Sequence, residues 1–199
     1  MGSKKKDNMK LTKDNLIKLK NDLDANLDNF FRAYYADQNI PVDIFAILER
    51  LNFDVYYGKL PRRYDGIMIV DENATVIEGF NSNKVIAANS KLSYRTSVFT
   101  LAHELAHYLA KRWLKSSETE KLEFEFREHT KKGERDETEN FMDFIAASIL
   151  MPKKQFIDDL ENAGIKNAMD ASSKVIDDLA AKYDVEYEAA RRRIDEVLS

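Results

Sequence analysis

FTLAHELAHYLAKRW, residues 99–113, is the stretch of the sequence that most constrains the fold. It contains His103 and His107, two of the three histidines of the chain, four positions apart. Apolar residues recur around them with helical spacing and predict a helix with one apolar face: Val98, Leu101, Ala102, Leu105, Tyr108 and Leu109. The two imidazoles then stand one turn apart on another face, so both can reach one metal ion.

The order histidine, glutamate, two spacers and histidine is typical of zinc peptidases. In this pattern the two rings bind Zn²⁺, and Glu104 is directed to the attacking water as a general base. The chain of 199 residues has no cysteine, so any metal site must use histidine and carboxylate ligands. The alternative interpretation is an amphipathic helix with exposed histidines that binds no metal.

A catalytic zinc site needs a third protein ligand, for which the sequence offers His129 and Glu139. His129 lies in a charged segment, where a single histidine is usually solvated. Glu139 and Asp143 lie one turn apart on an apolar helix, and an acidic pair there is costly unless a cation faces it. We therefore predict that Glu139 binds the ion and that Asp143 accepts the outer N–H of His103, fixing its tautomer. The alternative is a helix-terminal charge at Glu139 and a solvent-facing acid at Asp143.

The patterning of the remaining chain predicts an α+β fold. It comprises a small, twisted, antiparallel-rich sheet packed with the zinc helix and the acidic ligand helix, with extra helices at both ends. Further helices are expected over residues 11–37, 41–51 with Pro41 in the first turn, 138–151, 152–164, 172–183 and 186–198. Strands are expected over residues 53–57, 65–70, 74–80 and 84–89. The charged residues 115–137 are expected to form a loop or an exposed helix. The expected domains are a basic tail and amphipathic helix (1–39), a zinc metallopeptidase domain (40–163) and a C-terminal helical subdomain packed on it (164–199).

Composition narrows the function classes. The longest apolar run, around residues 144–151, is far shorter than the roughly 20 residues that span a bilayer, so we expect no membrane helix. The basic start of the chain is not followed by an apolar stretch, which favours the cytoplasm. The net charge of −4 argues against direct nucleic acid binding. The basic runs at 4–6 and at Arg191 to Arg193 are local exceptions, which we interpret as solvated.

Five segments together resemble the ImmA/IrrE family of metallo-endopeptidases: YDGIMIV (64–70), VIAANS (85–90), TLAHELAHYL (100–109), ETENFMDFIAASILMP (137–152) and LAAKYDVEYEAARRRI (179–194). The resemblance spans about residues 40–198. It implies zinc bound by His103, His107 and Glu139, with Glu104 as catalytic acid and base. It also implies a protein substrate, a helix-turn-helix repressor of a mobile element or stress regulon, whose cleavage relieves repression.

Three points stay open at this level. A donor for the oxyanion of the tetrahedral intermediate is expected, but spacing does not choose among Tyr94, Arg95, Tyr108 and His129. The β-rich KVIAAN (84–89) could be an edge strand that binds an extended peptide across the metal, or an ordinary sheet strand. The oligomeric state is unknown.

The main rival to an enzyme is a non-catalytic, zinc-containing regulator that binds a repressor or DNA. Its support is the long N-terminal helix and the run Arg191 to Arg193. The acidic net charge and the presence of Glu104 favour catalysis, because a structural zinc site does not need that glutamate and usually has four protein ligands.

Overall fold

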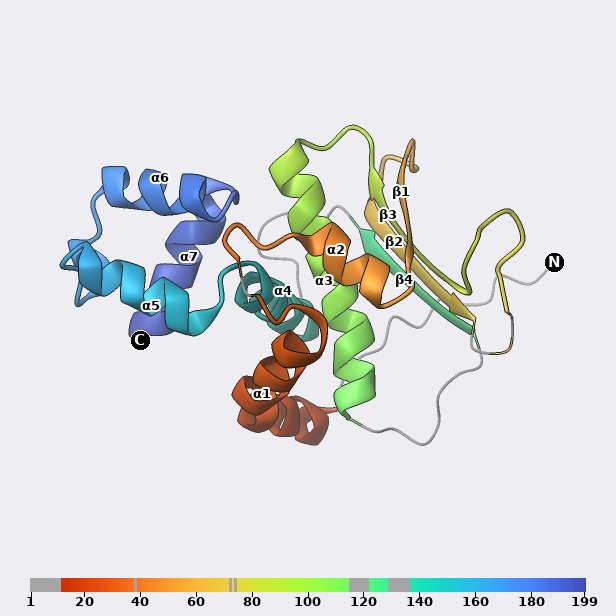
Figure 1. The fold of residues 1–199 in the computed structure, drawn as a ribbon, viewed down its shortest axis with the longest axis horizontal. Helices are drawn as coiled ribbons and strands as arrows, with labels where there is room; N and C mark the ends of the chain where they lie inside the picture. The colour runs from red at the N-terminus through yellow and green to blue at the C-terminus, as the bar shows by residue number, and fades with distance from the viewer. Residues whose placement is uncertain (1–11, 38, 72, 74, 115–121, 129–136) are drawn as a thin grey trace.

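The computed structural model describes residues 12–37, 39–71, 73, 75–114 and 137–199, together with the backbone of 122–128. It has the predicted α+β architecture. The sheet lies at one end of the molecule, helix α3 crosses the middle, and helices α5 to α7 lie at the other end (Figure 1). In the parts of the chain that the structure describes, no helix is long and apolar enough to cross a membrane.

The sheet is mixed and has four strands, β1 (Asp54–Gly58), β2 (Tyr64–Asp71), β3 (Lys84–Asn89) and β4 (Leu122–Glu128), in the order β1-β3-β2-β4. β2 pairs antiparallel with β3 and with β4, whereas β1 and β3 run parallel. Of the two alternatives for KVIAAN, the structure shows the ordinary sheet strand, because β3 is hydrogen-bonded on both sides and has no free backbone edge.

Two predictions about strands were wrong: one segment expected as a strand forms turns, and one segment not expected as a strand forms one. The expected strand at 74–80 is not formed over the described residues 75–80, which make turns. Gly79 there has φ +86°, a left-handed conformation that ends any extended run. Residues 122–128, expected in a loop or exposed helix, form β4 along β2. The alternation of apolar and charged residues in LEFEFRE is a strand signal that the charge of the surrounding segment obscured.

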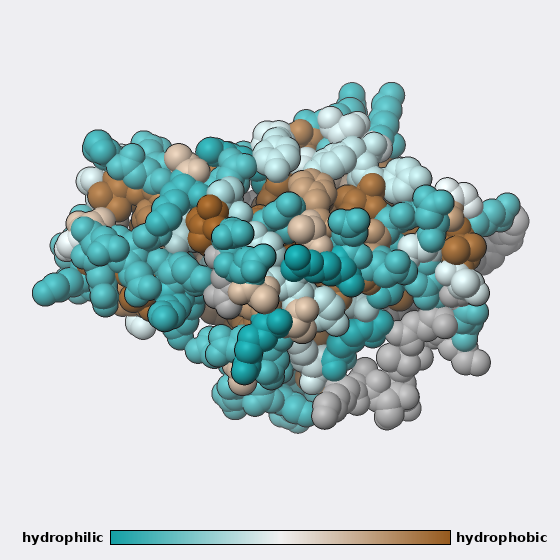
Figure 2. Space-filling model, in the orientation of Figure 1, coloured by the Kyte–Doolittle hydropathy of each residue, from teal (hydrophilic) through white to brown (hydrophobic). Residues whose placement is uncertain are grey.

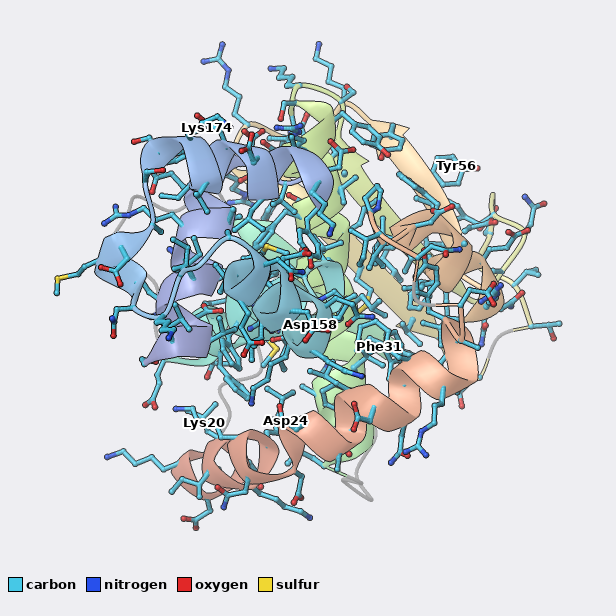
Figure 3. All side chains as sticks on the ribbon, turned by 60° about the vertical axis from the view of Figure 1, so that its left-hand side comes forward. Lys20, Asp24, Phe31, Tyr56, Asp158 and Lys174 are labelled. Atoms are coloured by element: carbon cyan, nitrogen blue, oxygen red, sulfur yellow. The ribbon has the colours of Figure 1, made fainter. Side chains whose placement is uncertain are left out.

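Helix α3 (Tyr94–Trp113) lies against one face of the sheet, and α4 (Glu137–Leu150) packs beside it (Figure 1). The N-terminal helix α1 (Lys13–Tyr34) contacts both, through a buried stripe of Leu16, Leu19, Leu23, Leu27, Phe30 and Phe31. On its side toward the other helices, Lys20 pairs with Glu137 of α4 at 3.2 Å (Figure 3). The expectation that Pro41 opens the next helix was wrong. Helix α2 (Ile44–Arg50) starts after Asp43, whose carboxylate accepts hydrogen bonds from two backbone amides of the first turn.

The chain ends in three helices, α5 (Lys153–Asn162), α6 (Ser173–Lys182) and α7 (Tyr187–Leu198), with a short 3₁₀ turn η1 (Ala168–Asp170) between α5 and α6. Gly164, just past α5, has φ +74° and ends that helix. Hydrophilic residues cover most of this end of the molecule (Figure 2, left). Asp24 of α1 pairs with Lys153 of α5 at 3.0 Å (Figure 3), and α7 contacts α4. The C-terminal helices are thus attached to the helix that carries Glu139 and Asp143.

Candidate metal centre

Helix α3 is buried on all sides around its histidines. Ser93 caps its N-terminus, and every residue from Thr100 to Ala110 is buried. The expectation of a single apolar face was therefore incomplete. The sheet covers one side of α3 and α4 covers another, so a helix that is apolar nearly all round is stable here. His103, Glu104 and His107 consequently lie inside the protein, where they need polar partners.

The two histidines and Glu139 converge on one point. His103 Nε2 lies 3.2 Å from His107 Nε2 and 3.2 Å from Glu139 Oε2, and His107 Nε2 lies 3.5 Å from Glu139 Oε1. The side chains of His103 and His107 are 1% and 6% exposed, and that of Glu139 is 27% exposed. The cluster is thus buried on the α3 side and open to solvent beside Glu139.

This cluster fits a tetrahedral metal ion. Bonds of about 2.0–2.1 Å at tetrahedral angles place neighbouring ligand atoms about 3.3 Å apart, close to the three distances above. Two imidazole nitrogens and one carboxylate are also a common donor set for catalytic divalent metals, with a fourth position left for substrate or water. Three of the residues predicted from sequence could therefore hold a metal ion together.

The histidines and Glu139 also influence each other electrostatically. Burial alone would raise the pKa of Glu139, but hydrogen bonds and charge from His103 and His107 hold the pKa of this carboxyl well below its usual range. Its place in the first turn of α4 adds the favourable field of a helix N-terminus. Glu139 is therefore anionic at neutral pH, as a ligand must be.

Asp143, one turn after Glu139, lies behind His103. Its Oδ1 is 2.7 Å from His103 Nδ1, and its side chain is 2% exposed. A carboxylate only accepts hydrogen bonds, so Nδ1 of His103 carries the proton and the Nε2 lone pair faces the cluster. On the far side, Arg192 Nη1 of α7 lies 3.6 Å from Asp143 Oδ2.

Glu104 is fully buried where α3 meets β2. The contact is very close: a Cβ on Gly66 would lie 2.5 Å from Thr100 Cγ2 and 2.9 Å from Glu104 Oε1. Only glycine lets the strand pass at this distance. Sequence reasoning missed this residue, although a lone glycine inside a strand pattern is a usual sign of a close backbone approach.

The structure separates the other predicted residues from the cluster. Tyr94 and Arg95 lie at the start of α3, about 12–14 Å along the helix axis before His103, and Arg95 pairs with Asp184 at 2.9 Å. The Tyr108 hydroxyl accepts a hydrogen bond from Lys84. These contacts do not favour any of the three as an oxyanion donor. His129 lies outside the described residues.

The arginine run was also misread as solvated. Arg193 is 2% exposed, donates from Nε to the carbonyl of Met151, and pairs through Nη1 with Glu196. Arg192 faces Asp143, and only Arg191 of the three is left to solvent without a hydrogen bond or ion pair to another described residue. Two of the three arginines thus connect α7 to α4.

Comparison with protein families agrees with this geometry. The family model of the IrrE N-terminal-like domain, a peptidase family, matches residues 60–195. The chain belongs to this family. The IrrE N-terminal-like match includes α3 and α4, which carry the candidate metal ligands, and most of α7, and family membership supports a metallopeptidase-type role. A comparison with curated proteins finds no match.

Proposed function

We propose that the protein is a zinc-dependent endopeptidase of the cytoplasm that cleaves a helix-turn-helix transcriptional repressor and thereby relieves repression. The observation that carries the proposal is the convergence of His103, His107 and Glu139 within hydrogen-bond distances, beside a buried glutamate one residue after the first histidine. A metal-free structural role would not need His103, Glu104 and His107 in the interior beside the partly exposed Glu139, because the burial of ionisable side chains is costly without a cation.

Zinc is the metal that the donor set favours. Histidine nitrogen and carboxylate oxygen in a three-ligand site are typical of catalytic zinc, and hard oxygen-only ions such as Mg²⁺ or Ca²⁺ avoid imidazole. When bound, zinc would act as a Lewis acid on the scissile carbonyl and increase the acidity of the attacking water.

Each of the clustered side chains has its own role in metal binding or in proton transfer. His103 and His107 hold the ion from one helix, Glu139 from the next, and Asp143 keeps the His103 ring in the tautomer that presents Nε2. Glu104 takes the proton of the attacking water and passes it to the leaving nitrogen. Its burial against Gly66 fixes the carboxylate and excludes bulk water from it.

The substrate part of the proposal rests on the resemblance to the ImmA/IrrE family, whose members act on helix-turn-helix repressors. The strands available to bind an extended segment of such a repressor are the sheet edges β1 and β4, since β3 is interior. The alternative, a regulator that binds DNA through Arg191 to Arg193, loses support because Arg193 is buried and Arg192 faces Asp143.

The test compares the wild type with Glu104→Gln and with a matched surface control, Glu49→Gln. Gln has nearly the same shape as Glu but cannot accept the proton, so cleavage of a repressor encoded beside the protein should fall by at least about 10²- to 10⁴-fold. Cleavage is measured by mass spectrometry, repressor binding by pull-down, and zinc by elemental analysis. Glu104→Gln should keep its zinc and its binding, and Glu49→Gln should behave as wild type.

Two results would overturn the proposal. Equal cleavage by Glu104→Gln and wild type would show that Glu104 is not the base. Wild-type protein that contains about one zinc and binds the repressor, yet never cleaves it, would instead favour the non-catalytic regulator.

A further inference from the structure

Asp143 is held from two sides by groups on two different helices. Its Oδ1 accepts from His103 of α3 at 2.7 Å, and its Oδ2 faces Arg192 of α7 at 3.6 Å. Because Asp143 is only 2% exposed, solvent contributes little to its orientation. The contacts with His103 and Arg192 therefore both contribute to the orientation of this carboxylate.

Helix α7 is anchored to α4 by the residue that follows Arg192. The next residue, Arg193, is buried, bonds to the carbonyl of Met151 at the end of α4, and lies over the ring of Phe144 at 5.5 Å. Arg193 also pairs with Glu196 one turn later on α7. A helix anchored in this way carries the neighbouring Arg192 to a fixed place beside Asp143.

From this arrangement we infer that Arg192, in the C-terminal helix, is a positioning residue for the metal site, acting on His103 through Asp143. The inference rests on the proposed metal centre. Arg192 pairs with Oδ2 of the Asp143 carboxylate, which orients the carboxylate and offsets part of its charge. Oδ1 of Asp143 then keeps its hydrogen bond with the Nδ1–H of His103, and the Nε2 lone pair of His103 remains directed at the ion. The metal affinity of the α3 and α4 ligands thus depends on the docking of α7.

Replacement of Arg192 is expected to change the zinc affinity only moderately. The Arg192 side chain is 55% exposed, and ion pairs of such residues contribute at most about 1 kcal/mol, which corresponds to about a fivefold change in affinity. The direction of the change in zinc affinity distinguishes positioning from a simple charge effect. Removing a positive charge near a cation site should by itself raise cation affinity, whereas loss of a positioning arginine should lower it.

The experiment measures the affinity of the full chain for Zn²⁺ by competition with a chromophoric chelator, in the wild type, Arg192→Gln, Arg192→Lys and Arg191→Gln. Arg191 is the matched control, since it is adjacent, equally charged, exposed and without a contact to Asp143 among the described residues. We expect Arg192→Gln to bind zinc about three- to fivefold more weakly. Arg192→Lys should recover most of the loss, and Arg191→Gln should bind as tightly as wild type or slightly more tightly.

Two further measurements separate positioning from a general loss of structure. In about 1 M salt, where the screening length is about 3 Å, the difference between Arg192→Gln and wild type should become smaller, because the Arg192 side of the pair is exposed to the salt. In an Asp143→Asn background, Arg192→Gln should have no additional effect, because the group through which it acts has lost its charge. Thermal unfolding of the metal-free proteins is recorded for each variant and should be unchanged within experimental error for Arg192→Lys.

The inference is overturned if Arg192→Gln binds zinc as tightly as wild type, if Arg191→Gln loses as much affinity, or if the Arg192 effect persists in full in the Asp143→Asn background. A wild-type protein that binds no zinc would instead refute the proposed metal centre itself. The two failures are therefore distinguishable.

Discussion

Helices α3 and α7 each carry three ionisable side chains in a short span, and the two differ in how their roles can be recognised. On α3, His103, Glu104 and His107 are spaced so that one turn of helix already brings the two imidazoles to one point. On α7, the consecutive Arg191, Arg192 and Arg193 point in different directions around the helix, and each meets a different environment: solvent, Asp143 and the buried end of α4.

The difference teaches that a motif can be interpreted from sequence when its members act together on one helix face. A run of like charges has no such internal geometry. Its meaning depends on which element the helix packs against. Here Arg193 is buried against the end of α4, and Arg192, although 55% exposed, contacts Asp143 of α4. Variants on both helices can test this contrast.

The largest effect is expected on α3. His103→Ala and His107→Ala each remove one of the three proposed zinc donors, so most of the zinc expected in the wild type, about one ion per chain, should be lost. Elemental analysis of purified protein measures this directly. His129→Ala, which removes the other third-ligand candidate suggested by the sequence, should keep its zinc. Full zinc retention in both α3 variants would rule out the site.

The pH dependence should also be steep. Imidazoles must be neutral to bind, so zinc affinity should fall as the pH drops below about 6.5, by up to about 100-fold per pH unit for two histidines. The pKa of Glu139, raised by burial but lowered more strongly by His103 and His107, lies below its usual range, so this carboxylate stays ionised across the pH range of the titration. Zinc titrations between about pH 5 and 8 measure the slope. A flat profile below pH 6.5 would contradict histidine ligation.

Next in size is Asp143→Asn, at the point where α3 and α7 both contact α4. Asn keeps an acceptor for His103 but loses the charge, so zinc affinity should fall by about 10- to 100-fold while the site still fills at high zinc. Competition titrations measure the change. Asp195→Asn, an exposed position on α7, is the control and should have no effect. The alternative of a solvent-facing acid at Asp143 was wrong, because its side chain is 2% exposed, so equal affinities for Asp143→Asn and wild type would show that the charge of this buried carboxylate does not support zinc binding.

On α7, Arg193→Met should lower the free energy of unfolding by about 2 kcal/mol. It removes the donor to the Met151 carbonyl and leaves Glu196, a partly buried acid, without its arginine. Chemical denaturation measures this loss, and Arg191→Met should show almost none because Arg191 is exposed. If the two variants unfold at the same denaturant concentration, the buried arginine does not anchor α7.

The smallest expected effect concerns the contact of α3 with the sheet. Gly66→Ala forces a Cβ against Thr100 and Glu104, which should cost about 1–2 kcal/mol of stability and displace the Glu104 carboxylate. Gly58→Ala is the matched control, since no atom lies within 4 Å of its Cβ position. Stability and repressor cleavage are measured together. Should Gly66→Ala match Gly58→Ala in both, the close approach has no functional role.

Several features could be predicted from the sequence because they depend on local periodicity. The helical repeat of 3.6 residues places His103 beside His107 and Glu139 above Asp143 wherever these helices lie. Apolar stripes and capping residues likewise indicated most of the helices. The family resemblance was available at the same level, since it rests on short segments of the chain, and the match over 60–195 confirms it.

Other features were decided only by the tertiary structure. Residues 122–128 became a strand by pairing with β2, more than 50 positions earlier in the chain, and β3 became interior because β1 and β2 pair with its two edges. His103 meets Asp143 across 40 positions, and Arg192 reaches Asp143 from a third helix. The periodicity of a single segment carries no information about such contacts, because they arise from which buried surfaces pack together once the whole core forms.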